Sequence, residues 1–221
     1  MSLAAVLQCL LVLTDHVVSA QTNLFKGYSG KGDGKIDDVV TTTLSNDVQL
    51  PLVGLGVGNL QRNLVESMIY DGLDGGHRVR LIDTAHQSAN ERDVARGIAT
   101  GVKAFKQTAN VADRVQVHVV TKIWYTYLGY ERTRIAVDDI LTDLQEAIKD
   151  PDVDLKVTLL LHWPRCYDHI PWMECEKEEN QLPARVRDAG PPPHLDKENA
   201  WKGSWKALED VYNSADYPVI A

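Results

Sequence analysis

Long apolar runs, clusters of basic residues and cysteines are all scarce in this chain of 221 residues. The most apolar segment runs only from Leu3 to Leu13, whereas a membrane-spanning helix needs about 20 residues, so we expect no membrane span. The 23 basic residues are outnumbered by 31 acidic ones, which argues against a nucleic-acid partner, since such partners usually require clustered Lys and Arg. Apolar residues are plentiful at 44%, enough to bury the core of one large domain or two small ones.

Three cysteines are too few to define a disulfide framework. Cys9 lies in the apolar N-terminal segment and would be lost with it on cleavage. Cys166 and Cys175 are nine residues apart. In an oxidising compartment these two could pair, and in a reducing one they are expected to be free thiols.

The first 47 residues differ in composition from the rest. In residues 1–20 the apolar run leads into Val18-Ser19-Ala20, which is typical of a signal-peptide cleavage site, but no Lys or Arg precedes the run. Two interpretations stay open: a cleaved signal peptide, which would direct the chain to the secretory pathway, and an ordinary apolar helix of a cytoplasmic protein. Residues 21–47 are rich in Gly, Asp, Lys, Ser and Thr and predict a flexible linker or arm ahead of a domain spanning 48–221.

From residue 48 onward, apolar segments of strand length alternate with helical patterns. Strands are expected at 48–57, 79–85, 115–124, 156–164 and 216–221, and helices at 63–73, 90–105, 132–150 and 197–215. Nearly continuous apolar strands that alternate with helices predict a parallel sheet covered by helices. The segment from Arg165 to Pro193 interrupts the pattern and predicts a long loop, of a kind that is usually functional or disordered.

Three successive expected strands end in ionisable residues, namely Asp83, Lys122 and His162. A parallel α/β fold, whether doubly wound or a barrel, places its functional site at the carboxyl edge of the sheet, where these residues fall. One polar residue at a strand end has an ordinary explanation, because polar character resumes there in any case. Three in succession predict a shared site.

Four motifs around these positions make the chain resemble the N-terminal half of an aldo-keto reductase. They are LPLVGLGV (50–57), RLIDTA with NE (80–85 and 90–91), VVTKIW (119–124) and LLLHWP (159–164), in the order of the first four strands of that family's barrel. The resemblance covers about residues 48–221. It implies an α/β fold class, a partial TIM (β/α)8 barrel with about four β/α units and the start of a fifth strand.

The resemblance also implies a function, the transfer of hydride between NADPH and a small carbonyl or alcohol substrate. In that family an aspartate and a lysine lower the pKa of a tyrosine that protonates the substrate oxygen, and a histidine orients the carbonyl. Asp83, Lys122 and His162 match the aspartate, the lysine and the histidine. Ser88 occupies the tyrosine position, and its hydroxyl is a much weaker acid than a phenol.

Other residues near the expected site have open roles. Alternative proton donors, which equally fit ordinary positions at the rim of the site, are His86, Tyr125 and Tyr127. The resemblance places NADP(H) beside Gly56, Val57 and Asp83, although Val57 stands where the family usually has Thr. A zinc site is a competing interpretation of His162, Cys166, His169 and Cys175. Their spacing matches no zinc motif, so we expect no metal.

The length of the ordered part bears on completeness. A (β/α)8 barrel needs about 200–250 residues or more, and the part with strand and helix patterns is shorter, so we expect a fragment or a truncated chain of a full reductase. Two alternatives remain: closure of a barrel by pairing with another half chain, and a non-catalytic binding or regulatory module on the same scaffold. Open sheet edges would favour self-association.

Overall fold

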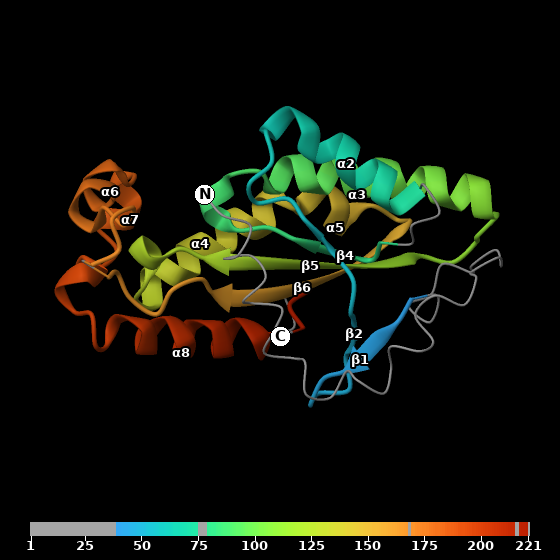
Figure 1. Cartoon of the computed structure of the whole chain (residues 1–221). Helices are drawn as coiled ribbons and strands as arrows, with labels where there is room; N and C mark the ends of the chain where they lie inside the picture. Colours follow the sequence, from blue (N-terminus) through green and yellow to red (C-terminus); the bar gives the residue numbers. More distant parts are fainter. Residues whose placement is uncertain (1–38, 75–78, 168, 215–216, 221) are drawn as a thin grey trace. The chain divides into compact units, whose positions relative to one another are not determined.

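The computed structural model of the chain describes residues 39–74, 79–167, 169–214 and 217–220 (Figure 1). The predicted signal peptide at 1–20 and residues 21–38 of the predicted linker lie outside the described residues. Within the described part, no helix is both long enough and apolar enough to cross a membrane.

A four-stranded parallel sheet forms the centre of the described structure. Its strands lie side by side in chain order and are β3 (Leu55–Gly56), β4 (Leu81–Asp83), β5 (Val115–Ile123) and β6 (Val153–Leu161). β5 and β6 pair along their whole length of nine residues. Beyond β6, Val219 forms an isolated parallel bridge with Val157, at the place of a fifth strand.

Helices connect the strands. They are α2 (Arg62–Asp74) after β3, α3 (Glu91–Ala109) after β4, α4 (Tyr130–Asp143) with α5 (Gln145–Lys149) after β5, and α8 (Ala200–Tyr212), which is the last helix after β6. Parallel strands that neighbour each other in chain order and alternate with helices are the arrangement of the first units of a (β/α)8 barrel. The predicted fold class, a partial and open barrel, is confirmed.

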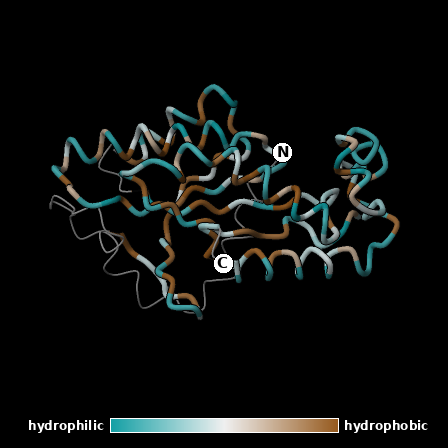
Figure 2. Tube along the Cα trace, turned by 180° about the vertical axis from the view of Figure 1, so that it is seen from behind, coloured by the Kyte–Doolittle hydropathy of each residue, from teal (hydrophilic) through white to brown (hydrophobic). Residues whose placement is uncertain are grey.

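The core lies between the helices and one face of the sheet. Successive strand residues point to opposite faces, and Val117 and Val119 of β5 are buried in one cluster with Ile98 of α3 and Ile140 of α4. The central strands are accordingly hydrophobic, while the helices alternate in character (Figure 2). The other sheet face is less covered, since Leu160 there is 44% exposed. Self-association through open sheet edges stays a prediction.

Helices α2 and α3 approach each other closely at two glycines of α3. A Cβ atom on Gly97 would lie 2.8 Å from Ile69 Cβ, and one on Gly101 would lie 3.0 Å from Leu73 Cβ. Larger residues would push α2 away. The close packing fixes α3, whose N-terminal residues Asn90 and Glu91 are buried at the end of β4.

Regular structure begins earlier than the sequence predicts. β1 (Thr41–Thr43) pairs antiparallel with β2 (Gln49–Pro51), so the last residues of the predicted linker at 21–47 form a hairpin. Thr41 Oγ1 donates to Gln49 Oε1 at 3.0 Å, and Gln49 Nε2 donates to Thr43 Oγ1 at 2.8 Å. Thr41 and Thr43 of the predicted linker are thus bonded to Gln49 of the strand expected at 48–57.

The expected loop from Arg165 to Pro193 is also folded, and it contains α6 (Cys175–Gln181) and α7 (Ala184–Arg187). Arg132 of α4 holds this segment. Its buried guanidinium donates to both carboxylate oxygens of Glu179 at 2.8 Å and to the carbonyl oxygens of Arg187 at 3.2 Å and Gly190 at 2.8 Å. A buried charge requires such partners, and they order the chain that supplies them.

Candidate active site

Asp83 and Lys122 form an ion pair at the carboxyl end of the sheet. Asp83 ends β4 opposite Val120 of β5, so Lys122 projects from the same face two residues further along. Lys122 Nζ donates to Asp83 Oδ2 at 2.7 Å and to the carbonyl oxygen of Thr84 at 2.7 Å. The side chains of Lys122 and Asp83 are 18% and 44% exposed, so a ligand can reach the pair from solvent.

A buried hydrogen-bond network fixes Thr84 behind this pair. The Thr84 N–H donates to the carbonyl oxygen of Val120 at 2.9 Å, and Thr84 Oγ1 donates to Asn90 Oδ1 at 2.5 Å. Asn90 Nδ2 donates in turn to the carbonyl oxygen of Val57 at 3.1 Å. The network joins three strands to the start of α3. Thr84 and Asn90 lie in the IDTA and NE motifs, but the sequence assigns them no role, because a motif does not show which side chains meet.

His162 follows β6 and adjoins the ion pair. Its backbone N–H donates to the carbonyl oxygen of Ile123 at 2.9 Å, which places it beside the end of β5. Burial lowers the pKa of the imidazole, the Lys122 cation lowers this pKa further, and the Asp83 carboxylate opposes both. The ring is therefore neutral at pH 7. Among the described residues, Nδ1 of this ring is buried without a hydrogen-bond partner, and Trp124 packs edge-on at 5.0 Å between ring centroids.

Ser88 ends a short 3-10 turn, η3 (His86–Ser88), which follows β4. Its Oγ atom lies 3.3 Å from the position that a Cβ atom on Gly58 would occupy, so the missing side chain of Gly58 leaves room beside the hydroxyl. Within the described part of the chain, Ser88 forms no side-chain hydrogen bond with Asp83, Lys122 or His162. The structure thus shows a serine beside Gly58 that is not bonded to the ion pair.

The three alternative proton donors belong to other environments. The Tyr125 hydroxyl donates to Glu178 of α6, and burial together with this bond raises the pKa of the phenol. Burial lowers the pKa of His86 and raises the pKa of Tyr127, and the rings of these two residues meet edge-on at 4.7 Å. The charges that act on His86 and Tyr127 include Asp139 and Arg185, whereas Lys122 and Asp83 act on His162. Among the described residues, none of the three forms a side-chain hydrogen bond with Asp83, Lys122 or His162.

Gly56 and Val57 differ in what they present to the site. A Cβ atom on Gly56, which is paired with Asp83 in the sheet, would have no atom within 4 Å, so there is open space beside the carboxylate. The side chain of Val57 is fully buried in the core. Its N–H donates to the carbonyl oxygen of Asp83 at 2.8 Å and its carbonyl oxygen accepts from Asn90. The Val57 side chain thus points into the core, and the cofactor contacts expected for Gly56, Val57 and Asp83 stay predictions.

The segment after His162 carries a disulfide and several aromatic rings. Cys166 and Cys175 are joined, with their Cα atoms 6.1 Å apart, so their sulfur atoms are not free to bind zinc. Across the described ranges, no group of three or more His, Cys, Asp and Glu side chains is placed to hold a metal ion. The rings of Trp163 and Trp172 lie 5.6 Å apart, beside Trp124.

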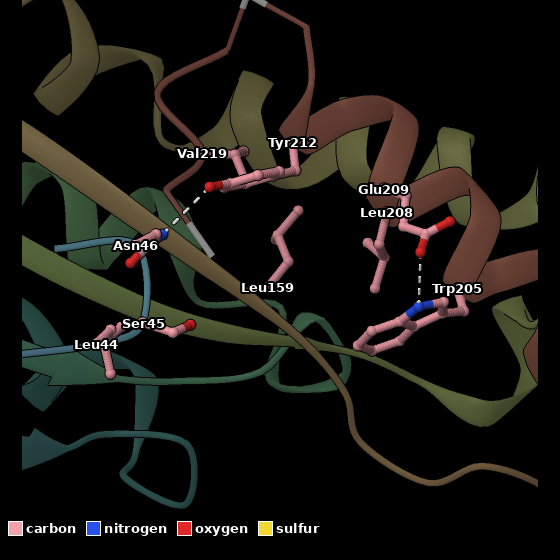
Figure 3. Close-up of a pocket in the computed structure, with 9 residues that line it drawn as sticks. All are labelled: Leu44, Ser45, Asn46, Leu159, Trp205, Leu208, Glu209, Tyr212 and Val219. Atoms are coloured by element: carbon pink, nitrogen blue, oxygen red, sulfur yellow. Dashed lines mark hydrogen bonds between the residues drawn. The ribbon is translucent and has the colours of Figure 1, made fainter. Parts of the chain in front are cut away.

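An apolar cavity of about 440 Å³ lies on the opposite face of the sheet from the ion pair (Figure 3). Leu159 of β6 lines it, and this residue alternates with Leu160, which is paired with Lys122. α8 closes one side, with Trp205 bonded to Glu209 at 3.1 Å. The cavity contains none of the predicted site residues, so we do not place the reaction there.

Comparisons with known proteins agree with the resemblance. No family model matches the chain. The chain is 28% identical to the NAD(P)H-dependent D-xylose reductase of Kluyveromyces lactis over 134 residues. This match covers 61% of this chain and 36% of that protein. It is 32% identical to an aldo-keto reductase of Mycolicibacterium smegmatis over 131 residues. This match covers 59% of this chain and 40% of that protein.

Among solved structures, an aldo-keto reductase of Bombyx mori in complex with NADP matches with a TM-score of 0.50 and 21% identity, covering 79% of this chain and 47% of that one. This likeness shows the fold. The chain spans less than half the length of these relatives.

Proposed function

Since the relatives of this chain are aldo-keto reductases, we propose that it carries the polar part of a site for NADP(H)-dependent oxidation or reduction of a small carbonyl or alcohol. The observation that carries the proposal is the contact of 2.7 Å between Lys122 and Asp83, with a neutral His162 beside it. The reduced dinucleotide, when bound, supplies a hydride.

The residues present fit such a cofactor. Open space beside Gly56 leaves room for a flat ring next to Asp83, whose carboxylate is partly exposed. The buried Nδ1 of His162 is without a partner among the described residues. Gly56 and Asp83 would hold the ring side of the dinucleotide.

Each polar residue has a distinct task in the proposal. Neutral His162 can donate one N–H hydrogen bond to a carbonyl oxygen and so orient it. The Lys122 cation favours the negative charge that develops on that oxygen, and Asp83 and the Thr84 carbonyl hold the ammonium in place. Ser88 stands at the proton-donor position as a weak acid, so we expect slow turnover.

A second candidate, a binding or regulatory module without turnover, is favoured by Ser88 itself. Among the described residues, no other donor is hydrogen-bonded to the ion pair, and Tyr125 is bonded to Glu178 instead. Such a module would keep the nucleotide site and lack the chemistry.

One titration separates these possibilities. NADPH fluorescence is followed on addition of the chain, and consumption of NADPH is then measured with a small aldehyde. We expect saturable binding, slow turnover, and loss of turnover in Lys122→Met. Lys149→Met is the matched control, because Lys149 is bonded only to Gln145 on the surface of α5 among the described residues. Binding without turnover would favour the module, and absence of binding would contradict both candidates.

A further inference from the structure

Trp172 belongs to a group of aromatic rings next to His162. Its ring stacks on Trp124 at 6.2 Å with an interplanar angle of 28°, and Trp124 packs in turn on His162. Trp172 is nevertheless 48% exposed, so its neighbours cover it only in part. Burial alone therefore does not fix the position of this ring, which also depends on a restraint on the loop that carries it.

The Cys166–Cys175 disulfide supplies that restraint. Trp172 lies in the short loop that the disulfide closes, three residues before Cys175. Cys166 is buried in a small hydrophobic cluster with Met173 and Trp124, and this cluster is separate from the main core. The disulfide thereby ties the chain on both sides of Trp172 to the ring that contacts His162.

Helix α6 has anchors of its own, which do not depend on the disulfide. Glu178 accepts a hydrogen bond from Trp124 Nε1 at 2.7 Å and another from the Tyr125 hydroxyl. Glu179 forms the buried ion pair with Arg132 at 2.8 Å. Opening of the disulfide would therefore free the loop before α6 and leave α6 attached to the domain.

The disulfide can be reached from one side. Cys175 is only half buried, and it borders an open groove of about 440 Å³ lined also by Met173, Glu176, Lys177 and His194. Cys166 on the other side is 2% exposed. A thiol reagent that enters the groove therefore reaches Cys175 before the buried Cys166.

We propose that the Cys166–Cys175 disulfide is a redox-responsive site, opened by a dithiol reductant, and that its opening releases Trp172 from Trp124 beside His162. A thiolate of the dithiol attacks Cys175 Sγ, the S–S bond breaks, and Cys166 leaves as a thiolate that takes up a proton. The second thiol of the reagent then displaces Cys175 and forms the oxidised reagent. In total the protein gains two electrons and two protons, which the dithiol loses.

The test compares the oxidised and the dithiothreitol-reduced full chain by near-UV circular dichroism in the tryptophan region, at wavelengths where the disulfide itself does not absorb. We expect reduction to lower the signal of the packed rings. Trp172→Phe should abolish this loss, and Trp205→Phe should preserve it, because Trp205 of α8 lines the separate apolar cavity. The double variant Cys166→Ser with Cys175→Ser should resemble the reduced chain whether or not reductant is present.

Four results would overturn the proposal. They are alkylation of Cys166 and Cys175 in the unreduced protein, an unchanged spectrum on reduction, a redox-dependent change that persists in Trp172→Phe, and loss of cooperative thermal unfolding on reduction. The last would show that the disulfide stabilises the whole domain and does not act locally. None of these readouts depends on NADPH, so they stand apart from the proposed reductase activity.

Discussion

Under the proposed function, replacement of Ser88 by tyrosine should raise the rate at which the chain reduces a small aldehyde. The substitution puts a phenol at the end of η3, at the position that the resemblance assigns to the proton donor. A nearby cation lowers the pKa of a phenol from its ordinary value near 10, which makes it a better proton donor at neutral pH. All other polar groups of the proposed site are already in position.

General acid catalysis typically contributes about 10²–10⁴-fold to a rate, or about 3–5 kcal/mol in the activation free energy. We therefore expect kcat for a small aldehyde to rise by about 10²-fold or more in Ser88→Tyr, which is the lower end of that range. The measurement is NADPH consumption at saturating aldehyde. Affinity for NADPH should change little, because the new hydroxyl acts on the substrate oxygen.

Two variants control for the added ring. Ser88→Phe has the ring without the hydroxyl and should show no gain. Gly58→Val combined with Ser88→Tyr should lose the gain, because Ser88 Oγ lies 3.3 Å from where a side chain on Gly58 would begin. If Ser88→Tyr binds NADPH and turns over no faster than Ser88→Phe, the assignment of position 88 as the donor position is wrong.

Three further predictions concern stability. Burial raises the pKa of Glu91 from 4.5 to about 7, so the stability of the folded chain falls as the pH rises from 4.5 to 7. Glu91→Gln should therefore stabilise the chain more at pH 8 than at pH 4.5. The stabilising effect of Glu91→Gln, measured as the free energy of unfolding in urea, should be larger at pH 8 than at pH 4.5 by up to about 3 kcal/mol. Burial and the Lys156 cation lower the pKa of His118 from 6.5 to about 4. The native state therefore loses stability as the pH falls from 6.5 to 4. His118→Gln should reduce this acid-induced loss in the free energy of unfolding by up to about 3 kcal/mol. Arg132→Met leaves the Glu179 carboxylate buried and unpaired and should cost about 3–5 kcal/mol in thermal or urea unfolding.

Each of these predictions has a result that would contradict it. Equal effects of Glu91→Gln at both pH values would mean that folding does not raise the pKa of Glu91. An unchanged acid sensitivity in His118→Gln would show that other groups cause it. For Arg132, the control is Arg185→Met, which breaks an exposed pair with Asp139 and should cost no more than about 1 kcal/mol. Similar costs for the two arginine variants would refute the role given to burial.

The sheet and its polar edge were predictable because the signals are local. Continuous apolar runs that end at Asp83, Lys122 and His162 are visible within single segments, and parallel strands must bring such ends to one edge. The helix predicted at 132–150 is interrupted at Leu144, where α4 ends and α5 follows, because helix boundaries depend on packing that the pattern does not contain.

Contacts between distant segments were not predictable. Arg132 and Glu179 are 47 residues apart, and nothing in either segment indicates that they form a buried pair that folds the segment after β6. Tyr125 was a reasonable proton donor by position, and only the contact with Glu178, 53 residues away, removes it from the site. The pairing of Cys166 with Cys175 was open in the sequence and is present in the structure.

Transfer of deuteride from NADPH labelled at the nicotinamide C4 to a small aldehyde tests directly whether Asp83, Lys122 and His162 form a reductase site. The alcohol product is analysed by mass spectrometry. We expect one deuterium on the carbinol carbon of the product, formed slowly by the natural chain, faster by Ser88→Tyr, and not by Lys122→Met. Absence of deuterium from the product of both the natural chain and Ser88→Tyr would contradict the claim that Asp83, Lys122 and His162 form a reductase site.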